Sequence, residues 1–477
     1  MIVRNRDALL SHGNVAGRRV VLDILETGLA AGDPYDNVRK TVRIEGGRLL
    51  IGSDEFPLGP MGACDPSRPR PFPPAPLVFD LDTIGAIYLV GGGKAAQRQA
   101  KAIEDVLGDR ITDGHVNAKK GDRIALERVS VTLAGHPNPD ADSVIGAQRI
   151  LAIERRAKKG DLVIMSESGG GTALLTLPAP GLTLRDIQEV NRILYLEHGA
   201  PMPVANAVRY LMMTLRQKHS RHVGDATLVM LSTDERPPRT DISLDRPRGV
   251  DDEYDHAIYL LKEYGCWDEI PEAVRRFLMR KDPTYTSLRQ DEWFDKPHFR
   301  IRVMGPEYML AAAEERARAL GLNVAIMASA LSNLDARTVG EAMGHIAREI
   351  ESHDRPLAAP CAFLVGGELV VAAGKDAGLG GRNQEFVVGA AARIAGSRRI
   401  VLGSADSDGS DGPTDYAGGI VDGDTVARAA EAGLPVPDVL RRHDTCGLLR
   451  RLGDAIDTGI LNTNVQDLRV VYVGPEV

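Results

Sequence analysis

The chain has 477 residues, and its 58 Lys and Arg residues against 66 Asp and Glu residues give a formal net charge of −8 at pH 7. This acidic balance argues against a nucleic-acid-binding protein, which would present a basic patch to the phosphates. Hydrophobic residues make up 43% of the chain and charged residues 26%, which is typical of a globular protein with room for two or three domains of about 150 residues each.

The cysteines and the N-terminus indicate a cytoplasmic location. The four cysteines lack the CxxC spacing of a zinc site and the density of a disulfide framework, which fits a reducing compartment. Residues 1–13 contain no apolar core of a signal peptide, and no stretch approaches the roughly 18 uncharged apolar residues that a membrane helix needs. We therefore expect a cytoplasmic protein with no nucleic-acid partner and no membrane partner.

Short apolar runs that end in Gly-rich turns alternate with segments of helical periodicity through the first half of the chain. This alternation predicts α/β architecture with a mainly parallel, Rossmann-like sheet. Strands are expected at 86–90, 161–165 and 227–232. Helices are expected at 95–108, 141–159 and 183–198.

The composition changes between about 241 and 298, where the sequence is polar, contains prolines and lacks regular periodicity. We interpret this segment as a connection or cover element between two α/β domains, which we place at 1–300 and 301–477. Beyond it, strands are expected at 299–305, 323–328, 361–374 and from 399 onward, with a helix at 336–352.

The sequence VGGGKAA at 90–96 follows an expected strand and precedes an expected helix. Gly91, Gly92 and Gly93 would let the backbone approach an anion, which the free N–H groups at the helix start could bind. Lys94 in the first helical turn opposes the helix dipole by about 0.3 to 1 kcal/mol unless an anion neutralises it. A bound phosphate or carboxylate would remove this conflict, and the alternative is a solvated lysine beside a packing turn.

The same turn matches the GxGxxA pattern of dinucleotide-binding proteins through Gly91, Gly93 and Ala96. The acidic residue that should follow about 20 positions later is missing, since lysines stand there. The turn is not a Walker A motif, which would need Gly in place of Tyr88 and Ser or Thr in place of Ala95.

A second Gly-rich turn, SESGGGTALL at 166–175, follows another expected strand. The alternative to a ligand-binding role is a tight turn that requires positive φ angles. Two such turns on parallel strands favour a ligand site at the carboxyl edge of the sheet. The backbone N–H groups and two hydroxyls that suit polyphosphate oxygens come from Ser168, Gly169, Gly170, Gly171 and Thr172.

The tract SADSDGSDGPTD at 404–415 places four aspartates in one loop, Asp406, Asp408, Asp411 and Asp415. Such carboxylates repel one another unless a metal ion or a cationic ligand holds them. The EF-hand pattern is excluded, since Ser410 and Asp411 stand where it needs Asp or Asn and then Gly. The alternative is a solvated turn whose aspartates cap backbone N–H groups.

Three single residues complete the candidates. Arg382, in the turn GLGGRNQE, presents a planar fork for a carboxylate or phosphate, although it could equally form a surface ion pair. Asp234 ends an expected strand, and carboxylates at the carboxyl ends of parallel strands face the ligand crevice. His136 also ends an expected strand, but a lone histidine is more often structural than catalytic and carries little weight.

These segments resemble the glycerate 2-kinase family, whose members have two domains with a C-terminal MOFRL domain and are often labelled hydroxypyruvate reductases. The resemblance runs from about Gly85 to Leu468. It consists, in chain order, of GGGKAA, GHPNPD, SESGGGTALL, NAVR, STDE, VGGE, GLGGRNQE, DGSDGPTDYAGGIVD and TNVQDL. It implies a Rossmann-like N-terminal domain, a mixed α/β MOFRL-type domain and a ligand cleft between them.

The resemblance also implies an activity, namely transfer of phosphate from ATP to the 2-hydroxyl of D-glycerate or a related small hydroxy acid, with Mg²⁺ as the metal. The lysine, aspartate and arginine of the family's active site fall on Lys94, Asp234 and Arg382. Asp234 would accept the hydroxyl proton, and Asp408 and Asp411 would bear on Mg²⁺. We allow for a homodimer. The expected nucleotide-binding set comprises Gly91, Gly92, Gly93, Ser168, Gly169, Gly170, Gly171, Thr172 and Asn383.

Three segments depart from the pattern of the family, and each is expected to line the ligand cleft. These changes predict a shifted acceptor and leave ATP use open. The alternatives are NAD(P)H-dependent reduction of a 2-oxo acid such as hydroxypyruvate, and a repurposed member that has lost ATP use. The segments are Arg216-Gln217-Lys218 in place of Lys-Gly-Gly, 235–248 in place of a Gly-bearing Ser-Gly-Pro loop, and Gly459-Ile460-Leu461-Asn462 in place of Gly-Pro-Thr-Gly.

Overall fold

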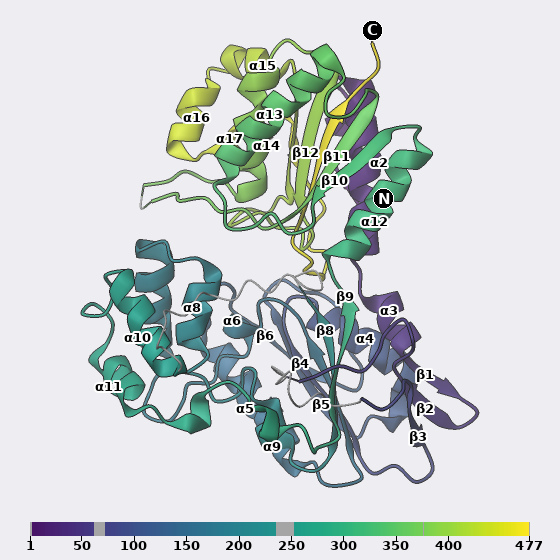
Figure 1. The fold of residues 1–477 in the computed structure, drawn as a ribbon, viewed down its shortest axis with the longest axis vertical. Coiled ribbons are helices and arrows are strands. Elements are labelled where there is room, and N and C mark those ends of the chain that lie inside the picture. The colour runs from purple at the N-terminus through teal and green to yellow at the C-terminus, as the bar shows by residue number, and fades with distance from the viewer. Residues whose placement is uncertain (1, 62–71, 235–251, 375, 477) are drawn as a thin grey trace. The chain divides into compact units, whose positions relative to one another are not determined.

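The computed structural model describes residues 2–61, 72–234, 252–374 and 376–476 (Figure 1). These residues divide into two compact units, each with its own six-stranded sheet. The parallel-sheet unit comprises the described residues of 34–233 and 241–303, and the mixed-sheet unit comprises 2–33, Asp234 and the described residues from 304 onward. The N-terminal segment therefore belongs to the same unit as the C-terminal half, whereas the sequence predicts that it belongs to a domain of residues 1–300.

The strands of the parallel-sheet unit lie in the order β6-β5-β4-β7-β8-β9. Neighbouring strands from β6 to β8 pair in parallel. Hydrogen bonds from Leu228 N to Pro297 O and from Asp234 N to Met304 O show that β9 runs in the same direction. The strands are β4 (Ile87–Gly92), β5 (Asp113–Lys119), β6 (Ser130–Ala134), β7 (Leu162–Glu167), β8 (Thr227–Thr233) and β9 (His298–Met304).

The strand order reverses beside β4. From β4 the chain moves outward to β5 and β6, and then returns through α5 (Ala141–Arg156) to β7 on the other side of β4. Because such crossovers are right-handed, α4 (Ala96–Leu107) and α5 cover opposite faces of the sheet (Figure 1). In open α/β sheets, ligands bind outside the carboxyl ends of the strands at a reversal of this kind. The two Gly-rich turns follow the carboxyl ends of β4 and β7, the strands on the two sides of this reversal.

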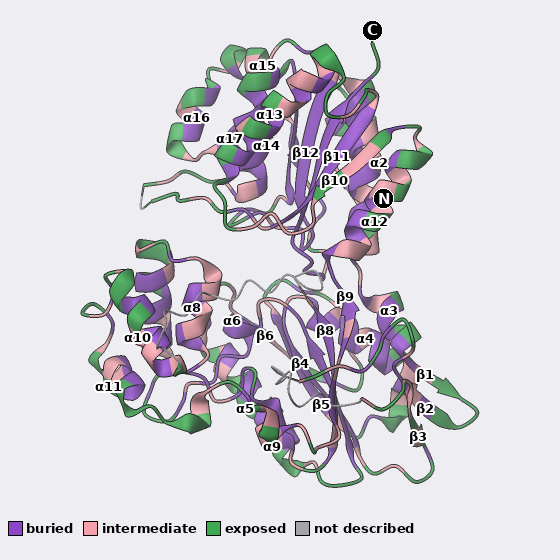
Figure 2. Cartoon of the chain, viewed as in Figure 1, coloured by how far each residue is buried: buried purple, intermediate pink, exposed green. Residues whose placement is uncertain are grey.

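A helical cluster with its own apolar core belongs to the same unit (Figure 2). The polar segment that was expected to be irregular contributes two of its helices, α10 (Glu253–Glu263) and α11 (Glu272–Arg280). Tyr254, Leu261 and Phe277 are buried in this core, while charged residues on the same helices remain exposed. The other members of the cluster are α7 (Leu184–Val190), the wider π-helical turn η2 (Asn191–Glu197) and α8 (Met202–Arg209).

Short elements complete the parallel-sheet unit. An antiparallel sheet of three strands follows α3 and precedes β4. The elements are α3 (Tyr35–Thr41), β1 (Val42–Glu45), β2 (Arg48–Ile51), β3 (Leu77–Asp80), η1 (Gly108–Arg110), α6 (Gly171–Leu174), α9 (His219–Val223), η3 (Pro283–Tyr285) and η4 (Gln290–Glu292).

The sheet of the mixed-sheet unit has the strand order β10-β11-β15-β12-β13-β14. The pair β10–β11 is parallel and the other pairs are antiparallel. The strand expected at 361–374 ends at Gly367, which adopts a φ of +105°. The strands are β10 (Asn323–Ala328), β11 (Cys361–Gly367), β12 (Ile400–Asp406), β13 (Gly418–Asp422), β14 (Ala455–Ile456) and β15 (Asp467–Val473).

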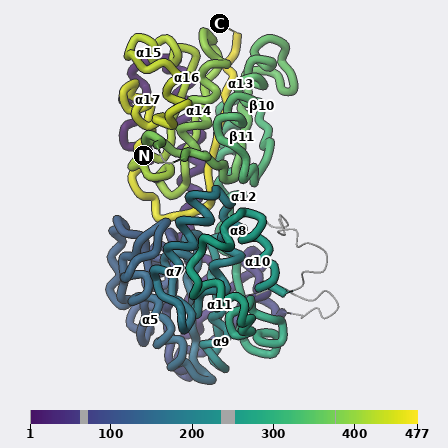
Figure 3. Tube along the Cα trace, turned by 90° about the vertical axis from the view of Figure 1, so that its left-hand side faces the viewer, coloured from purple at the N-terminus to yellow at the C-terminus, as the bar shows by residue number. Residues whose placement is uncertain are grey.

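Helices cover both faces of the mixed sheet. On one face, the N-terminal helix α2 (Val15–Ala31) packs beside α12 (Pro306–Ala319) (Figure 1) and also contacts the strand β15 near the other end of the chain. Figure 3 shows the same unit from the side. No helix of the described residues combines the length and the apolar character needed to cross a membrane. The remaining helices are α1 (Arg6–Leu9), α13 (Ala336–His353), α14 (Arg382–Ile394), α15 (Thr425–Glu431), α16 (Val436–Arg442) and α17 (Thr445–Leu452).

Candidate active site

The two Gly-rich turns of the parallel-sheet unit are joined directly to each other. Lys94 N donates to Gly169 O at 2.9 Å, and Ala95 N donates to Ser168 Oγ at 2.9 Å. A Cβ atom on Gly93 would overlap Ser168, so this contact requires glycine. The N–H groups of Lys94 and Ala95 therefore have protein partners, and part of the glycine pattern serves packing. The structure also places Gly91, Gly92, Gly171 and Thr172 here, all of them buried.

Two cationic or titratable side chains lie over Gly170. This residue has a φ of +83°, and a Cβ atom built on it would lie 3.1 Å from Lys94 Cγ and 3.1 Å from His136 Cδ2. The structure thus brings His136 beside Lys94, although a lone histidine in the sequence carries little weight as a catalytic candidate. The signal that could have identified His136 is its place in the GHPNPD motif, two residues after the end of β6 at Ala134.

The first departing segment lies next to the second turn. Arg216 forms an ion pair with Glu167 at the end of β7, and a Cβ atom on Gly171 would lie 3.4 Å from the Arg216 guanidinium. Gln217 has a φ of +60°, so it keeps a left-handed conformation where the family pattern has glycine. Lys218 is buried and donates to Tyr210 O at 2.6 Å and to Arg216 O at 3.3 Å. The charges of this segment therefore face inward.

In the mixed-sheet unit, Arg382 at the start of α14 is surrounded by carboxylates. Its Nε and Nη2 atoms donate to the two oxygens of Asp467 at 2.9 and 3.0 Å, and Nη2 also donates to Asp406 at 2.7 Å. Nη1 lies 3.2 Å from Glu368. Although burial alone would lower it, the pKa of Arg382 is raised by Asp467, Glu368 and Asp406. Arg382 is therefore a fully ionised fork in a network that the sequence did not indicate.

Asp411 holds the first turn of α14. Its carboxylate accepts hydrogen bonds from Asn383 N at 3.0 Å, Asn383 Nδ2 at 3.2 Å and Gln384 N at 2.8 Å. Burial raises the pKa of Asp411 to about 6. This geometry favours the alternative interpretation of the acidic tract, in which aspartates cap backbone N–H groups, although the turn is buried rather than solvated. Asn383 likewise uses its amide on Asp411 and Asp467.

Asp408 lies beside the third departing segment. Asp408 Oδ1 accepts hydrogen bonds from Ser410 N at 2.8 Å and Ser410 Oγ at 2.9 Å, and the backbone carbonyl of Asp408 accepts one from Leu461 N at 3.1 Å. Ile460 is 39% exposed next to this contact. Asn462 has a φ of +53°, the region that the glycine of the family pattern would adopt freely. The segment 459–462 thus packs directly on the acidic loop.

Asp234 follows the last residue of β8, as the sequence predicts. Its backbone N–H donates to Met304 O at 2.9 Å, and the residue is partly exposed. The second departing segment, 235–248, begins directly after it and lies outside the described residues. Asp234 therefore stands where two parallel strands end together, the edge at which ligands bind in such sheets.

Comparisons with known proteins cover most of the chain. Residues 20–217 match the family described as "Domain of unknown function (DUF4147)", and residues 361–467 match the MOFRL family. The chain is 30% identical over 465 residues to the glycerate 2-kinase of Pyrococcus horikoshii, covering 95% of this chain and 98% of that one. It is 34% identical to the D-glycerate 2-kinase of Thermotoga maritima over 80% of this chain and 89% of the relative.

A comparison with solved structures also finds similarity to a glycerate kinase. The crystal structure of a glycerate kinase from Thermotoga maritima superposes with a TM-score of 0.71 at 28% sequence identity. The match covers 95% of this chain and 99% of the other. The similarity in sequence and the similarity in fold therefore both extend over nearly the whole length of the chain.

Proposed function

The chain belongs to the glycerate 2-kinase family and is a kinase, and we propose that it transfers phosphate from ATP to a hydroxyl of glycerate or a related small hydroxy acid. The observation that carries this proposal is the hydrogen-bonded pair of Gly-rich turns at the strand reversal, with Lys94 lying over Gly170. Phosphoryl transfer requires charge neutralisation and positioning more than covalent chemistry. Lys94 supplies a positive charge at this edge of the sheet.

The other candidate residues have roles that follow from their chemistry. Lys94 and the turn 168–172 would bind phosphate oxygens of ATP, and Arg382 would bind an oxyanion of one substrate. Asp234 would accept the proton of the attacking hydroxyl, since a partly exposed carboxylate can act as a general base. These proposed roles rest on the chemistry of each side chain and on its position at the end of a strand or near the start of a helix.

In the described part of the chain, only one or two carboxylates would be available to bind Mg²⁺ in the proposed site. No cluster of three or more His, Cys, Asp or Glu side chains suited to a metal ion exists among the described residues. Mg²⁺ usually keeps several waters and binds one or two carboxylates together with substrate phosphates. Asp408 is the carboxylate that we propose for this role, because Asp411 is engaged by α14. When bound, the ion would neutralise charge on the phosphates.

We propose that the acceptor carries an apolar substituent and that D-glycerate is a poor substrate. Ile460 and Leu461 lie against the loop of Asp408 and replace a Pro-Thr pair of the family pattern. Placing a hydroxyl against these side chains without a partner would cost about 1 to 3 kcal/mol, or roughly ten- to a hundredfold in kcat/KM. An apolar group would instead gain from the same surface.

ADP release measured against C3 to C6 hydroxy acids, polyols and aryl-substituted diols tests the activity and the acceptor together. We expect turnover with at least one hydroxy acid and a kcat/KM for D-glycerate below about 10⁴ M⁻¹s⁻¹. A value above that limit would show that the acceptor is not shifted. Thermal shift with ATP–Mg²⁺ and with NADH or NADPH distinguishes the alternatives, since stabilisation by a nicotinamide alone would contradict the kinase with ATP as donor.

Substitution of Lys94 tests the site. We expect Lys94→Ala to lower kcat by about 10² or more, since a charge aimed at the reacting phosphate contributes on this scale. Lys101→Ala is the matched control, because Lys101 lies on α4, the helix that begins two residues after Lys94, and pairs with Asp105 at the surface. Circular dichroism and Tm establish that both variants fold. Wild-type turnover in Lys94→Ala would remove Lys94 from the mechanism.

A further inference from the structure

The two edges of the Arg382 guanidinium have different surroundings, and this difference has a consequence that rests on the proposed binding of an oxyanion by Arg382. The edge formed by Nε and Nη2 faces Asp467 and Asp406, whose side chains are 0% and 2% exposed. The opposite corner, Nη1, faces Glu368, whose side chain is 42% exposed. One edge is therefore enclosed by protein, and the other is within reach of solvent.

Asp467 fixes the enclosed edge. It binds Nε and Nη2 through separate oxygens, which is the bidentate arrangement that defines the plane of a guanidinium. Asp467 is itself held by Asn383 Nδ2 at 3.0 Å and by the buried Arg469. Arg469 in turn donates to Gly367 O at 3.1 Å. Asp467 therefore has no freedom to follow a moving arginine, and it sets the direction in which Nη1 points.

Glu368 is fixed in its backbone but not in its side chain. Its N–H donates to Ser332 Oγ at 3.0 Å, and its carbonyl accepts from Asn333 N at 2.9 Å. Its carboxylate approaches Nη1 at 3.2 Å from a half-exposed position. Rotation of this side chain into solvent would therefore free Nη1 without any change in the backbone.

The charges of the network oppose an additional anion. Two guanidinium groups, Arg382 and Arg469, face three carboxylates, Asp406, Asp467 and Glu368. An incoming carboxylate or phosphate would meet excess negative charge as long as Glu368 stays on Nη1. Of the three carboxylates, Glu368 alone is substantially exposed, so its side chain can rotate into water with the least rearrangement of the surrounding protein.

We propose that Glu368 is an exchangeable counter-ion, which occupies the Nη1 corner of Arg382 until an oxyanion of the substrate replaces it, while Asp467 is the positioning residue that keeps Arg382 oriented for the exchange. The oxyanion is either the carboxylate of the hydroxy acid or a phosphate of the nucleotide. These two sources share the chemistry that a guanidinium recognises, and a binding experiment separates them.

Calorimetric titration of Glu368→Gln tests the exchange. D-glycerate without nucleotide and ATP–Mg²⁺ without acceptor are the two probes, and glycerol is the neutral probe. We expect Glu368→Gln to bind one oxyanion probe roughly 2- to 5-fold more tightly than the wild type, with no change for glycerol, since partly exposed ion pairs have effects of this size. Glu341→Gln, which removes a carboxylate from surface ion pairs on α13, should leave all affinities unchanged.

A double-variant comparison tests Asp467. Asp467→Asn keeps the size of the side chain and one acceptor oxygen, and we expect it to lower kcat by about 10²-fold through loss of the bidentate contact. If Asp467 acts through Arg382, the variant Arg382→Ala with Asp467→Asn should have the same kcat as Arg382→Ala alone, within about twofold. A merely structural role would make the two losses multiply.

The outcomes separate this proposal from the proposed kinase reaction. Equal affinities of wild type and Glu368→Gln for both oxyanion probes, or binding of neither probe by either protein, would overturn the exchange. A multiplicative loss in the double variant would overturn the positioning role of Asp467. Tighter oxyanion binding by Glu368→Gln without ADP release from any acceptor would support the exchange and contradict the kinase reaction. The Glu368→Gln titration remains decisive if Asp467→Asn fails to fold.

Discussion

Gly170 satisfies a conformational requirement and a spatial requirement at once. Its φ of +83° disfavours any other residue type, and the space above it is taken by Lys94 and His136. Gly160 shares the positive φ, at +95°, but has no atom within 4 Å of a built Cβ. A substitution at Gly160 therefore tests backbone strain alone, whereas a substitution at Gly170 tests strain together with the contact to its neighbours.

We expect Gly170→Ala to lower both stability and kcat, and Gly160→Ala to lower stability alone. The left-handed conformation costs an alanine about 1 to 2 kcal/mol at either site. Only at Gly170 does the added methyl also displace Lys94 and His136. Urea unfolding and ADP release on both variants measure the two effects, and equal kcat values in the two variants would show that the contact over Gly170 is unimportant.

Lys218 gives the molecule a predictable pH dependence. Burial, together with the positive charge of Arg221, lowers the pKa of Lys218 to about 7 from 10.5. Its partners are two carbonyl oxygens, which a neutral amine can still satisfy. Between pH 7 and about 10.5 only the unfolded chain therefore carries this proton. Unfolding then takes up a proton, and the free energy of unfolding rises with pH.

We expect this rise to approach about 1.4 kcal/mol per pH unit between pH 7 and pH 9 and to disappear in Lys218→Met. Below pH 7 the amine is charged in both states, and its contribution is constant. Lys159→Met removes an exposed lysine and should keep the rise. Denaturant titrations at pH 7, 8 and 9 measure the slope, and identical slopes in wild type and Lys218→Met would refute the assignment.

At the level of elements, α13 and α14 approach so closely that their backbones touch. A Cβ atom on Gly340 of α13 would overlap Phe386 O of α14, and one on Gly389 of α14 would lie 2.7 Å from Arg337 O. Glycine at these positions therefore sets the distance between the helices.

We expect Gly340→Ala to lower the free energy of unfolding by about 1 to 3 kcal/mol, because the helices must separate to admit one methyl group. Ala342→Val enlarges an exposed residue of the same helix and should cost only about 0.5 kcal/mol of helix propensity. Denaturant unfolding of the two variants provides the comparison. A loss in Gly340→Ala no greater than that of Ala342→Val would mean that the helices adjust freely.

The elements that the sequence predicts best are those with uninterrupted apolar runs. β4, β7 and β8 lie where expected because strands buried on both faces need such runs. α10 and α11 were missed because their apolar residues form a stripe among many charges, and prolines around them suggested irregular chain. The end of β11 at Gly367 was missed because the apolar run continues beyond it, while the backbone turns away.

Some features of the candidate site could also be predicted from the sequence, and others could not. The proximity of Lys94 to the turn 168–172 follows from the sequence, because parallel strands place their carboxyl ends at one edge. The capping of α14 by Asp411 and the contacts of Arg382 with Glu368 and Asp467 depend on strands β11, β12 and β15 being neighbours. That order of strands is not encoded in the spacing of any motif.

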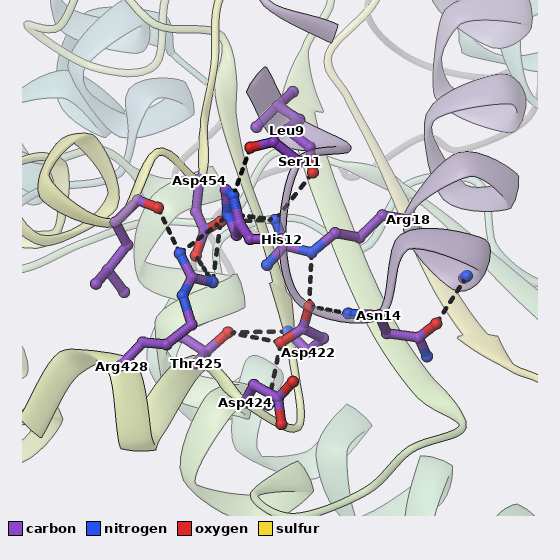
Figure 4. A network of polar contacts seen from close by, with 12 residues as sticks. Leu9, Ser11, His12, Asn14, Arg18, Asp422, Asp424, Thr425, Arg428 and Asp454 are labelled. Carbon is purple, nitrogen blue, oxygen red and sulfur yellow. Dashed lines mark hydrogen bonds and ion pairs between the residues drawn. The ribbon is translucent and has the colours of Figure 1, made fainter. Parts of the chain in front are cut away.

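At the level of the whole molecule, a buried ionic network joins the two ends of the chain (Figure 4). Arg18 of α2 binds Asp422 through Nε and Asp454 through Nη1, both at 2.6 Å, and all three side chains are fully buried. His12 and Arg428 also bind Asp454. The N-terminal segment is therefore part of the mixed-sheet unit through charge as well as through packing.

We expect Arg18→Met to lower the free energy of unfolding by about 3 to 5 kcal/mol, because it leaves two buried carboxylates with fewer charge partners. Arg19→Met changes the neighbouring exposed arginine and should stay within about 0.5 kcal/mol of the wild type. Chemical denaturation of both variants tests this. Equal stability would mean that the network contributes nothing net.

The location of α2 also determines the order in which the molecule can be completed during synthesis. Gly28 of α2 lies so close to Leu468 of β15 that a Cβ atom would overlap it, yet α2 leaves the ribosome long before β15. The described residues of the parallel-sheet unit all lie between 34 and 303, so they are available while translation continues. The apolar face of α2 must instead wait for α12, β12 and β15, which are all synthesised much later, so we expect this helix to be exposed in the nascent chain and open to chaperone binding.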